Sequence, residues 1–133
     1  MAVNSPAPQV LVVDDEEALV DLICNMLKMA RITAEPCPIG LQAFQYIRRA
    51  QPQLVILDLM MPEVDGATLF EQLRADGVTA TIPILLISAG NVSVTKQVPG
   101  FRQHYDAFLP KPFGIHTLIN TVRTMLRGSV PKY

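Results

Sequence analysis

The chain has 133 residues, of which half are hydrophobic and 17% are charged, and its formal net charge is −1 at pH 7. This length and composition predict a single folded domain with a substantial core, and they exclude intrinsic disorder. Because there is no concentrated run of Lys and Arg, direct binding of nucleic acid is not expected. No apolar run approaches the roughly 20 residues that cross a bilayer, and no signal-peptide pattern opens the chain. A cytoplasmic protein with two reduced cysteines is therefore predicted.

Short apolar runs alternate with longer segments whose apolar residues recur every three or four positions. In chain order, the patterns predict a strand at 9–13, a helix at 16–30, a strand at 32–36, a helix at 40–50, a strand at 54–57, a helix from 66 to about 77, strands at 82–88 and 107–110, and a helix from about 114. The strands are apolar at nearly every position, which is typical of strands covered on both faces. The alternation predicts a doubly wound α/β domain with a parallel sheet.

The spacing of apolar residues predicts a buried face on each of these helices. The helix at 40–50 is expected to bury Leu41, Phe44 and Ile47, and the last helix a stripe that begins at Ile115. Between the last two strands, "NVSVTKQVPGFRQHY" also has apolar residues at helical spacing, but a Pro-Gly pair at 99–100 interrupts them. A fourth helix in this region is therefore expected to be short, broken or irregular.

Polar side chains stand at the carboxyl ends of four predicted strands. Asp14 and Asp15 follow the first strand, Asp58 ends the third, Ser88 ends the fourth and Lys111 follows the fifth. Because ligands of an open parallel sheet bind beyond these ends, the five side chains are expected to converge. Taken singly, the aspartates have ordinary explanations, namely helix capping and turn formation. Together the five residues predict a functional site.

The residue types at this edge predict phosphoryl chemistry. Clustered carboxylates need a cation, or a raised pKa, at neutral pH. Oxygen ligands suit Mg²⁺, which also accepts phosphate oxygens, and Lys111 adds a charge suited to phosphate. A carboxylate between a metal ion and a lysine can attack phosphorus and form an aspartyl phosphate. Asp58, at the end of the third strand, is placed for such chemistry and has a charge partner available.

Four motifs resemble the receiver domain of two-component response regulators in order and approximate spacing. They are "VLVVDDE", "LVILDLMMPEVDG", "LLISA" and "FLPKPF". The resemblance covers residues 9–127 and leaves 1–8 as an N-terminal segment expected to be flexible and 128–133 as a tail or truncated linker. It implies a flavodoxin-like sheet of five parallel strands in the order 2-1-3-4-5, with five helices. It also implies a phosphoacceptor rather than an enzyme with a separate substrate.

The resemblance assigns a role to each matching acidic residue. Asp58 is the implied phosphoacceptor, loaded from a phosphohistidine. Asp15, Asp58 and the backbone carbonyl of Met60 are the implied direct ligands of Mg²⁺, and Asp14 is implied to act through a water molecule.

The remaining matches concern the phosphoryl group and the switch. Ser88 is implied to hydrogen-bond the phosphoryl group and Lys111 to contact one of its oxygens, with the bond from Lys111 to Pro112 commonly cis. Phe108 stands at the aromatic switch position, and a plain core role for it is an equal alternative. Met60 replaces the polar residues sometimes found near the leaving phosphate, which predicts slow self-hydrolysis.

Departures from the family pattern concern the readout of the switch. His104-Tyr105 stands where the family usually has Gly-Ala, which puts in question the coupling of the fourth helix to Phe108. The implied partner is a histidine kinase or a histidine phosphotransfer protein, and a homodimer or an effector domain is a further option. Neither nucleic acid nor a membrane is expected to bind this domain.

Three other functions compete with the phosphorylated switch. The main alternative is a receiver-like interaction module that acts independently of phosphorylation, and the retention of Asp58 and Lys111 disfavours it. A phosphohydrolase would need a second acid where Met60 stands, and a flavin carrier would need a phosphate-binding loop after the first strand. Both are disfavoured.

Overall fold

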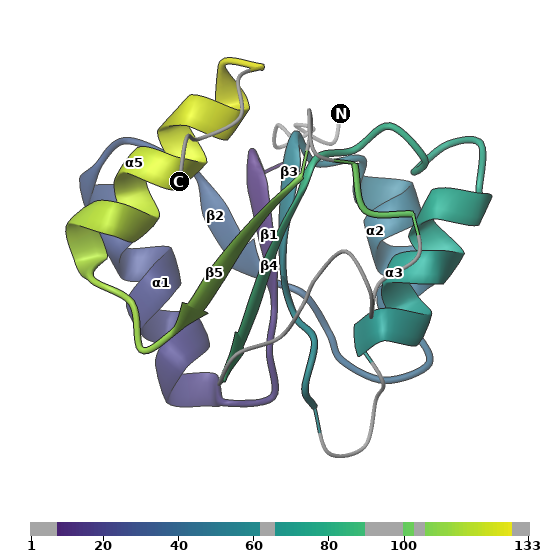
Figure 1. The fold of residues 1–133 in the computed structure, drawn as a ribbon, viewed down its shortest axis with the longest axis horizontal. Coiled ribbons are helices and arrows are strands. Elements are labelled where there is room, and N and C mark those ends of the chain that lie inside the picture. The colour runs from purple at the N-terminus through teal and green to yellow at the C-terminus, as the bar shows by residue number, and fades with distance from the viewer. Residues whose placement is uncertain (1–7, 62–65, 90–99, 103–105, 129–133) are drawn as a thin grey trace, which may run out of the picture.

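In the computed structural model, residues 8–61, 66–89, 100–102 and 106–128 are described. They form alternating strands and helices (Figure 1). The elements are β1 (Val10–Val13), α1 (Glu17–Met29), β2 (Ala34–Pro36), α2 (Ala43–Ala50), β3 (Leu54–Asp58), α3 (Gly66–Ala75), β4 (Ile84–Ala89), β5 (Ala107–Lys111) and α5 (Ile115–Leu126). Their order confirms the predicted α/β alternation. Among the described residues, no helix is both long and apolar enough to cross a membrane.

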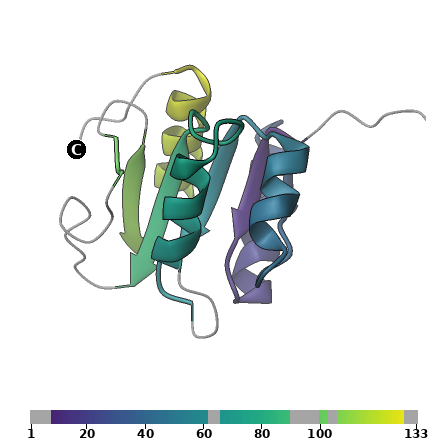
Figure 2. The same cartoon turned by 90° about the vertical axis from the view of Figure 1, so that its right-hand side faces the viewer.

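The strands form one parallel sheet in the order β2-β1-β3-β4-β5, as expected from the resemblance. Helices α1 and α5 cover one face, and α2 and α3 cover the other (Figures 1 and 2). Successive side chains of a strand point to opposite faces. Leu11 and Val13 therefore join the core on the α2 and α3 side, whereas Val10 and Val12 join the core on the α1 and α5 side. Every residue of β1 is buried because both faces are covered.

The buried face of α2 differs from the prediction. Leu41 is fully exposed, so its assignment to the core was wrong. The helix begins only at Ala43, because Gly40 has a φ of +94°, which is incompatible with a helix. Ala43 and Ile47 are buried, and Phe44 is partly buried against the same core.

The prediction that the buried stripe of α5 begins at Ile115 is also wrong. Ile115 is 42% exposed, whereas Leu118 and Val122 further along the helix are buried as expected. Ile115 is the first residue of the helix, and its side chain lines an open groove between α1 and α5. The apolar spacing of a helix therefore predicts its middle turns better than its first turn.

Only residues 100–102 are described in the connection between β4 and β5, apart from Asp106 at its end. Except for those three residues, the expected fourth helix lies outside the described residues, as does the pair His104-Tyr105. Gly100 has a φ of +93° and lies against the side chains of Phe70 and Arg74 in α3. The end of the connection is therefore packed on α3.

A buried ion pair joins α3 to the start of β5. The guanidinium of Arg74 donates to the Asp106 carboxylate, and it also donates to the carbonyls of Ala80 and Ile82 at 3.2 and 2.9 Å. Asp106 is 1% exposed, and its carboxylate accepts the backbone N–H of Ile84 at 2.9 Å. The pair ties α3, β4 and β5 together at the amino edge of the sheet.

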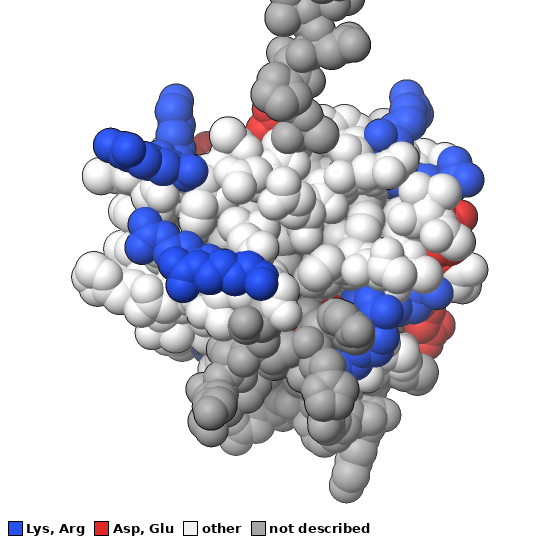
Figure 3. Space-filling model, turned by 90° about the horizontal axis from the view of Figure 1, so that it is seen from above, with Lys and Arg blue, Asp and Glu red and all other residues white. Residues whose placement is uncertain are grey.

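Basic residues gather at the same edge. Because the helices run antiparallel to the strands, their carboxyl ends meet at the amino edge of the sheet. Each described helix has cations in its last turn, namely Lys28, Arg48, Arg49, Arg74 and Arg123. Figure 3 shows Lys and Arg side chains around this end of the molecule. Cations in these positions stabilise the helix dipoles.

Replacing Arg74 with Met should lower the free energy of unfolding by about 3–5 kcal/mol, because the buried Asp106 carboxylate would lose its counter-charge. Urea unfolding followed by far-UV circular dichroism measures this change. Arg48→Met is the matched control, since it removes the exposed ion pair with Asp76 and should cost less than about 1 kcal/mol. Equal losses in the two variants would contradict a special role for the buried pair.

Candidate functional site

Three aspartates meet at the carboxyl edge of the sheet, as the sequence predicts. Val13 of β1 is paired with Leu57 of β3, so Asp14, which follows β1, lies beside Asp58, which ends β3. The carboxylates of Asp14, Asp15 and Asp58 offer oxygens that all lie within 4.8 Å of one another. Asp14 and Asp58 are 5% and 3% exposed, so the centre of this cluster is buried.

Lys111 supplies the positive charge at this cluster. Its Nζ lies 2.8 Å from Oδ2 of Asp14 and 3.2 Å from Oδ2 of Asp58. It also reaches Glu16, whose Oε1 is 3.4 Å away. The lysine comes from β5 and crosses the edge of β4 to reach β3 and β1. One ammonium group therefore bridges the two buried carboxylates and offsets part of the repulsion between them.

Backbone hydrogen bonds orient both buried aspartates in the same way. Oδ1 of Asp58 accepts the backbone N–H of Met60 at 3.0 Å, and Oδ1 of Asp14 accepts the backbone N–H of Glu16 at 3.0 Å. Each aspartate thus bonds the N–H two residues ahead with one oxygen and Lys111 with the other. The two carboxylates are held in fixed orientations before any ligand binds.

The surroundings shift the pKa values of Asp58 and Lys111. Burial raises the pKa of Asp58 and the charge of Asp14 adds to this effect, whereas the Met60 N–H and Lys111 oppose it. Burial alone would lower the pKa of Lys111, but its hydrogen bonds and charge interactions with Asp14 and Asp58 outweigh burial and raise it. Lys111 therefore stays charged, and the cluster retains an excess of negative charge.

Ser88 and Phe108 occupy β4 and β5 beside this cluster. Ser88 is fully buried and pairs with Pro110 across the β4–β5 ladder, and its hydroxyl donates to the Ala89 carbonyl at 3.4 Å. Phe108 is half-buried against the core on the α2 and α3 side. Both residues lie on strands that reach the site.

One contact of the site was missed by sequence reasoning. Glu16 forms the third ion pair of Lys111, and the run of acids that begins with Asp14 and Asp15 was the available signal. The bond between Lys111 and Pro112 is cis, as the resemblance implies.

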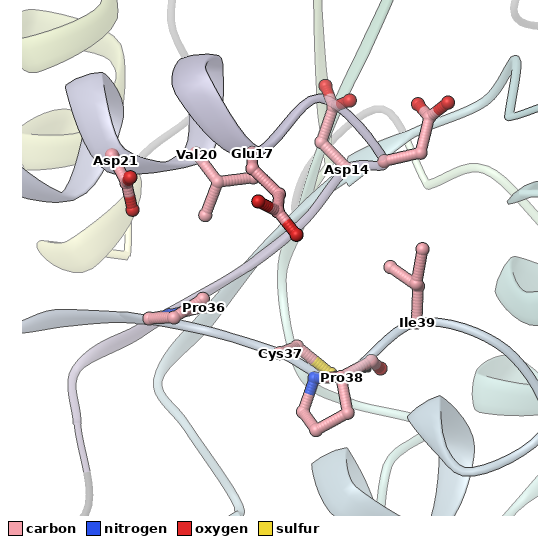
Figure 4. Close-up of a pocket in the computed structure, with 9 residues that line it drawn as sticks. Asp14, Glu17, Val20, Asp21, Pro36, Cys37, Pro38 and Ile39 are labelled. Carbon is pink, nitrogen blue, oxygen red and sulfur yellow. Dashed lines mark hydrogen bonds between the residues drawn. The ribbon is translucent and has the colours of Figure 1, made fainter.

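A cavity of about 350 Å³ opens beside Asp14 and Asp15. Glu17 and Asp21 of α1 line one side, and Pro36 at the end of β2 and residues 37–39 after it line the other (Figure 4). Cys37 lies in this wall as a free thiol, and burial raises its pKa to about 12. The negative charge of the cluster thus continues along α1.

The donor set suits a hard divalent cation. Carboxylate oxygens are the ligands that Mg²⁺ prefers, and the cation would offset the excess negative charge. Mg²⁺ binds oxygens at roughly 2.1 Å and keeps several waters, so carboxylates grouped within 4.8 Å of one another can hold it directly or through water. The described residues therefore fit a magnesium ion.

The chain matches the model of the response regulator receiver domain family over residues 10–123. The DNA-binding dual master transcriptional regulator RpaA of Synechocystis is 36% identical over 120 residues, which cover 90% of this chain and 49% of the relative. The response regulator MprA of Mycobacterium leprae is 33% identical over 123 residues, which cover 92% of this chain and 53% of the relative. The chain spans about half the length of these curated relatives.

Solved receiver domains have the same fold. The receiver domain of the Francisella response regulator 1452 matches with a TM-score of 0.77 at 25% identity, covering 90% of this chain and 97% of that domain. The signal receiver domain of a signal transduction histidine kinase from Syntrophus aciditrophicus matches with a TM-score of 0.78 at 26% identity, covering 92% of each chain. These similarities confirm the flavodoxin-like fold and the resemblance on which it rested.

Replacing Asp58 with Asn should raise the free energy of unfolding at neutral pH when no divalent cation is present. The pKa of Asp58 is raised in the folded protein, so its ionised form weakens the fold as pH rises from the ordinary carboxyl pKa through the raised value. The extra stability of the variant over the wild type should therefore disappear as pH falls below the ordinary carboxyl pKa. Urea unfolding of both proteins in EDTA at several pH values measures this difference.

Asp76→Asn is the control, because it should change the free energy of unfolding in the opposite direction. Burial opposes the shift, but the hydrogen bonds from the Val78 N–H and Arg48 and the charge of Arg48 together outweigh it and lower the pKa of Asp76. Asp76 therefore stabilises the fold above the ordinary carboxyl pKa and loses that effect as pH falls. Asp76→Asn should lower stability at neutral pH. If Asp58→Asn also lowered stability at neutral pH, the ionised Asp58 carboxylate would not be unfavourable in the folded protein, contrary to its raised pKa.

Proposed function

The chain belongs to the response regulator receiver domain family, and we propose that Asp58 accepts a phosphoryl group from a phosphohistidine on a histidine kinase or histidine phosphotransfer protein. The observation that carries the proposal is the burial of Asp58 beside Asp14 and Asp15, with the ammonium of Lys111 bridging the strands.

In the proposed transfer, an oxygen of Asp58 forms a bond to phosphorus while the bond from phosphorus to the histidine nitrogen breaks. The electron pair of the broken bond returns to the imidazole, which takes up a proton. Lys111 already contacts Asp58, so its charge is available to a phosphoryl oxygen on that carboxylate. Ser88 is proposed to donate a hydrogen bond to the same group.

We propose that Asp15, Asp58 and the Met60 carbonyl bind Mg²⁺ directly and that Asp14 acts through water. The grouping of the three carboxylates within 4.8 Å of one another supports a cation at this place. Mg²⁺, when bound, would neutralise charge on the transferring group. The side chain of Met60 is 64% exposed, and a thioether cannot orient water strongly, which supports slow self-hydrolysis.

The proposed output is a change of surface rather than turnover of a separate substrate. A phosphoryl group on Asp58 would draw the Ser88 hydroxyl toward it and leave space that the half-buried ring of Phe108 can enter. Residues 9–127 are proposed as the receiver domain, with a homodimer or an effector domain as further partners. Phosphorylation-independent docking is the alternative function.

The groove between α1 and α5 is proposed as the docking surface of the phosphohistidine donor. Its volume is about 380 Å³, and its apolar lining includes Leu19, Leu22, Ile23, Met26, Phe113 and Ile115. Lys111 and Glu16 belong to the same lining, so the groove is continuous with the site. Leu22 and Ile115 are 46% and 42% exposed, which leaves apolar surface for a partner to cover.

Wild-type protein should gain one phosphoryl group when incubated with Mg²⁺ and acetyl phosphate, whereas Asp58→Asn should gain none. Intact-mass spectrometry measures the gain, and EDTA should abolish it because the cation is required. Asp76→Asn is the matched control, because it alters an aspartate away from the cluster and should still be modified. If the wild type neither gains a phosphoryl group nor forms a Mg²⁺-dependent beryllofluoride complex, phosphate-independent docking is the better function.

Replacing Leu22 with Gln should slow phosphotransfer from a histidine kinase that phosphorylates the wild type by about fivefold or more, because a contact in the groove is lost. Modification by acetyl phosphate should not change, since that donor needs no protein surface. Leu41→Gln is the matched control, because Leu41 is fully exposed and lines neither the groove nor the acidic cavity. Equal kinase rates for the two variants would contradict the proposed surface.

A further inference from the structure

Gly66, the first residue of α3, lies directly against the backbone of the proposed phosphoacceptor. A Cβ atom at this position would overlap the carbonyl oxygen of Asp58. It would also lie 2.7 Å from Cα of Leu59 and 3.0 Å from the carbonyl carbon of Asp58. These are backbone atoms, which cannot turn aside as the end of a flexible side chain can. Only a residue without a Cβ fits the present distance between α3 and β3.

Both sides of this contact are held by other interactions. Leu69, Phe70 and Leu73 anchor α3 in the core on its side of the sheet. On the other side, the backbone N–H of Leu59 donates to the carbonyl of Ile87 in β4 at 3.0 Å. A larger residue at position 66 must therefore move α3 or the peptide that follows Asp58. Because α3 is anchored by three buried side chains, the peptide at the end of β3 is expected to take up at least part of the shift.

That peptide controls the geometry of the site. Oδ1 of Asp58 is oriented by the backbone N–H of Met60, two residues ahead, and Oδ2 by Lys111. The Met60 carbonyl, which is a proposed ligand of Mg²⁺, belongs to the same short segment. A shift of the peptide between Asp58 and Leu59 would therefore change the separation of the proposed ligands.

We propose that Gly66 is a positioning residue: the absence of a side chain lets α3 pack against the Asp58–Leu59 peptide and keeps residues 58–60 in the geometry that binds Mg²⁺ and accepts the phosphoryl group. This inference rests on the proposed function. It goes beyond that function because Gly66 contacts neither the cation nor the phosphoryl group and acts through the backbone.

Gly66→Ala tests the proposal, with Gly77→Ala as the matched control. A Cβ at Gly77 would meet no atom within 4 Å, so that variant carries the same chemical change without the contact. Calorimetric titration with Mg²⁺, corrected for the folded fraction, should give about 10- to 100-fold weaker binding for Gly66→Ala and unchanged binding for Gly77→Ala. In the metal-free protein, the amide resonances of Leu59 and Met60 should shift only in Gly66→Ala.

The outcomes separate this inference from the proposed function. If the wild type binds no Mg²⁺ and accepts no phosphoryl group, the proposed function fails. If the wild type does both and folded Gly66→Ala binds Mg²⁺ equally well, the inference alone is overturned. Should the variant be unfolded in buffer, the titration is repeated in an osmolyte that favours the compact state. A variant that stays unfolded there also overturns the inference, since Gly66 would then be a requirement of folding.

Discussion

The carboxyl edge of the sheet depends on the ion pairs that Lys111 makes with Asp14 and Asp58. Both carboxylates are almost inaccessible to solvent, and a buried charge without a partner is strongly unfavourable. The lysine comes from β5, whereas the aspartates follow β1 and end β3. The Lys111 ammonium can meet both carboxylates only when all three strands lie in one sheet, so the site depends on the complete sheet.

The sequence predicts the strands and the site because both follow from short-range patterns and one topological rule. Apolar runs identify the buried strands, and the polar residue at each carboxyl end then has a defined edge. Asp14, Asp58 and Lys111 meet for that reason. Leu41 was misplaced because apolar spacing does not determine where a helix begins, which here depends on the backbone conformation of Gly40.

Other features depend on positions in space that no local pattern contains. Arg74 and Asp106 are 32 residues apart, and each would be expected on the surface if taken alone. The contact of Gly66 with the backbone of Asp58 depends on the distance between a helix and a strand. Hydrophobic periodicity reports which face of an element is buried, but it does not report how closely two elements approach.

The separation of charge between the two edges of the sheet makes the molecule electrically polar. Acidic residues crowd the edge that carries Asp58, and helix-terminal cations occupy the opposite edge. Such a field extends about 10 Å into solution at 0.1 M salt, so it acts on an approaching partner before contact. A phosphohistidine donor protein with a basic surface would be oriented toward the acidic edge before contact, and a larger share of encounters would be productive.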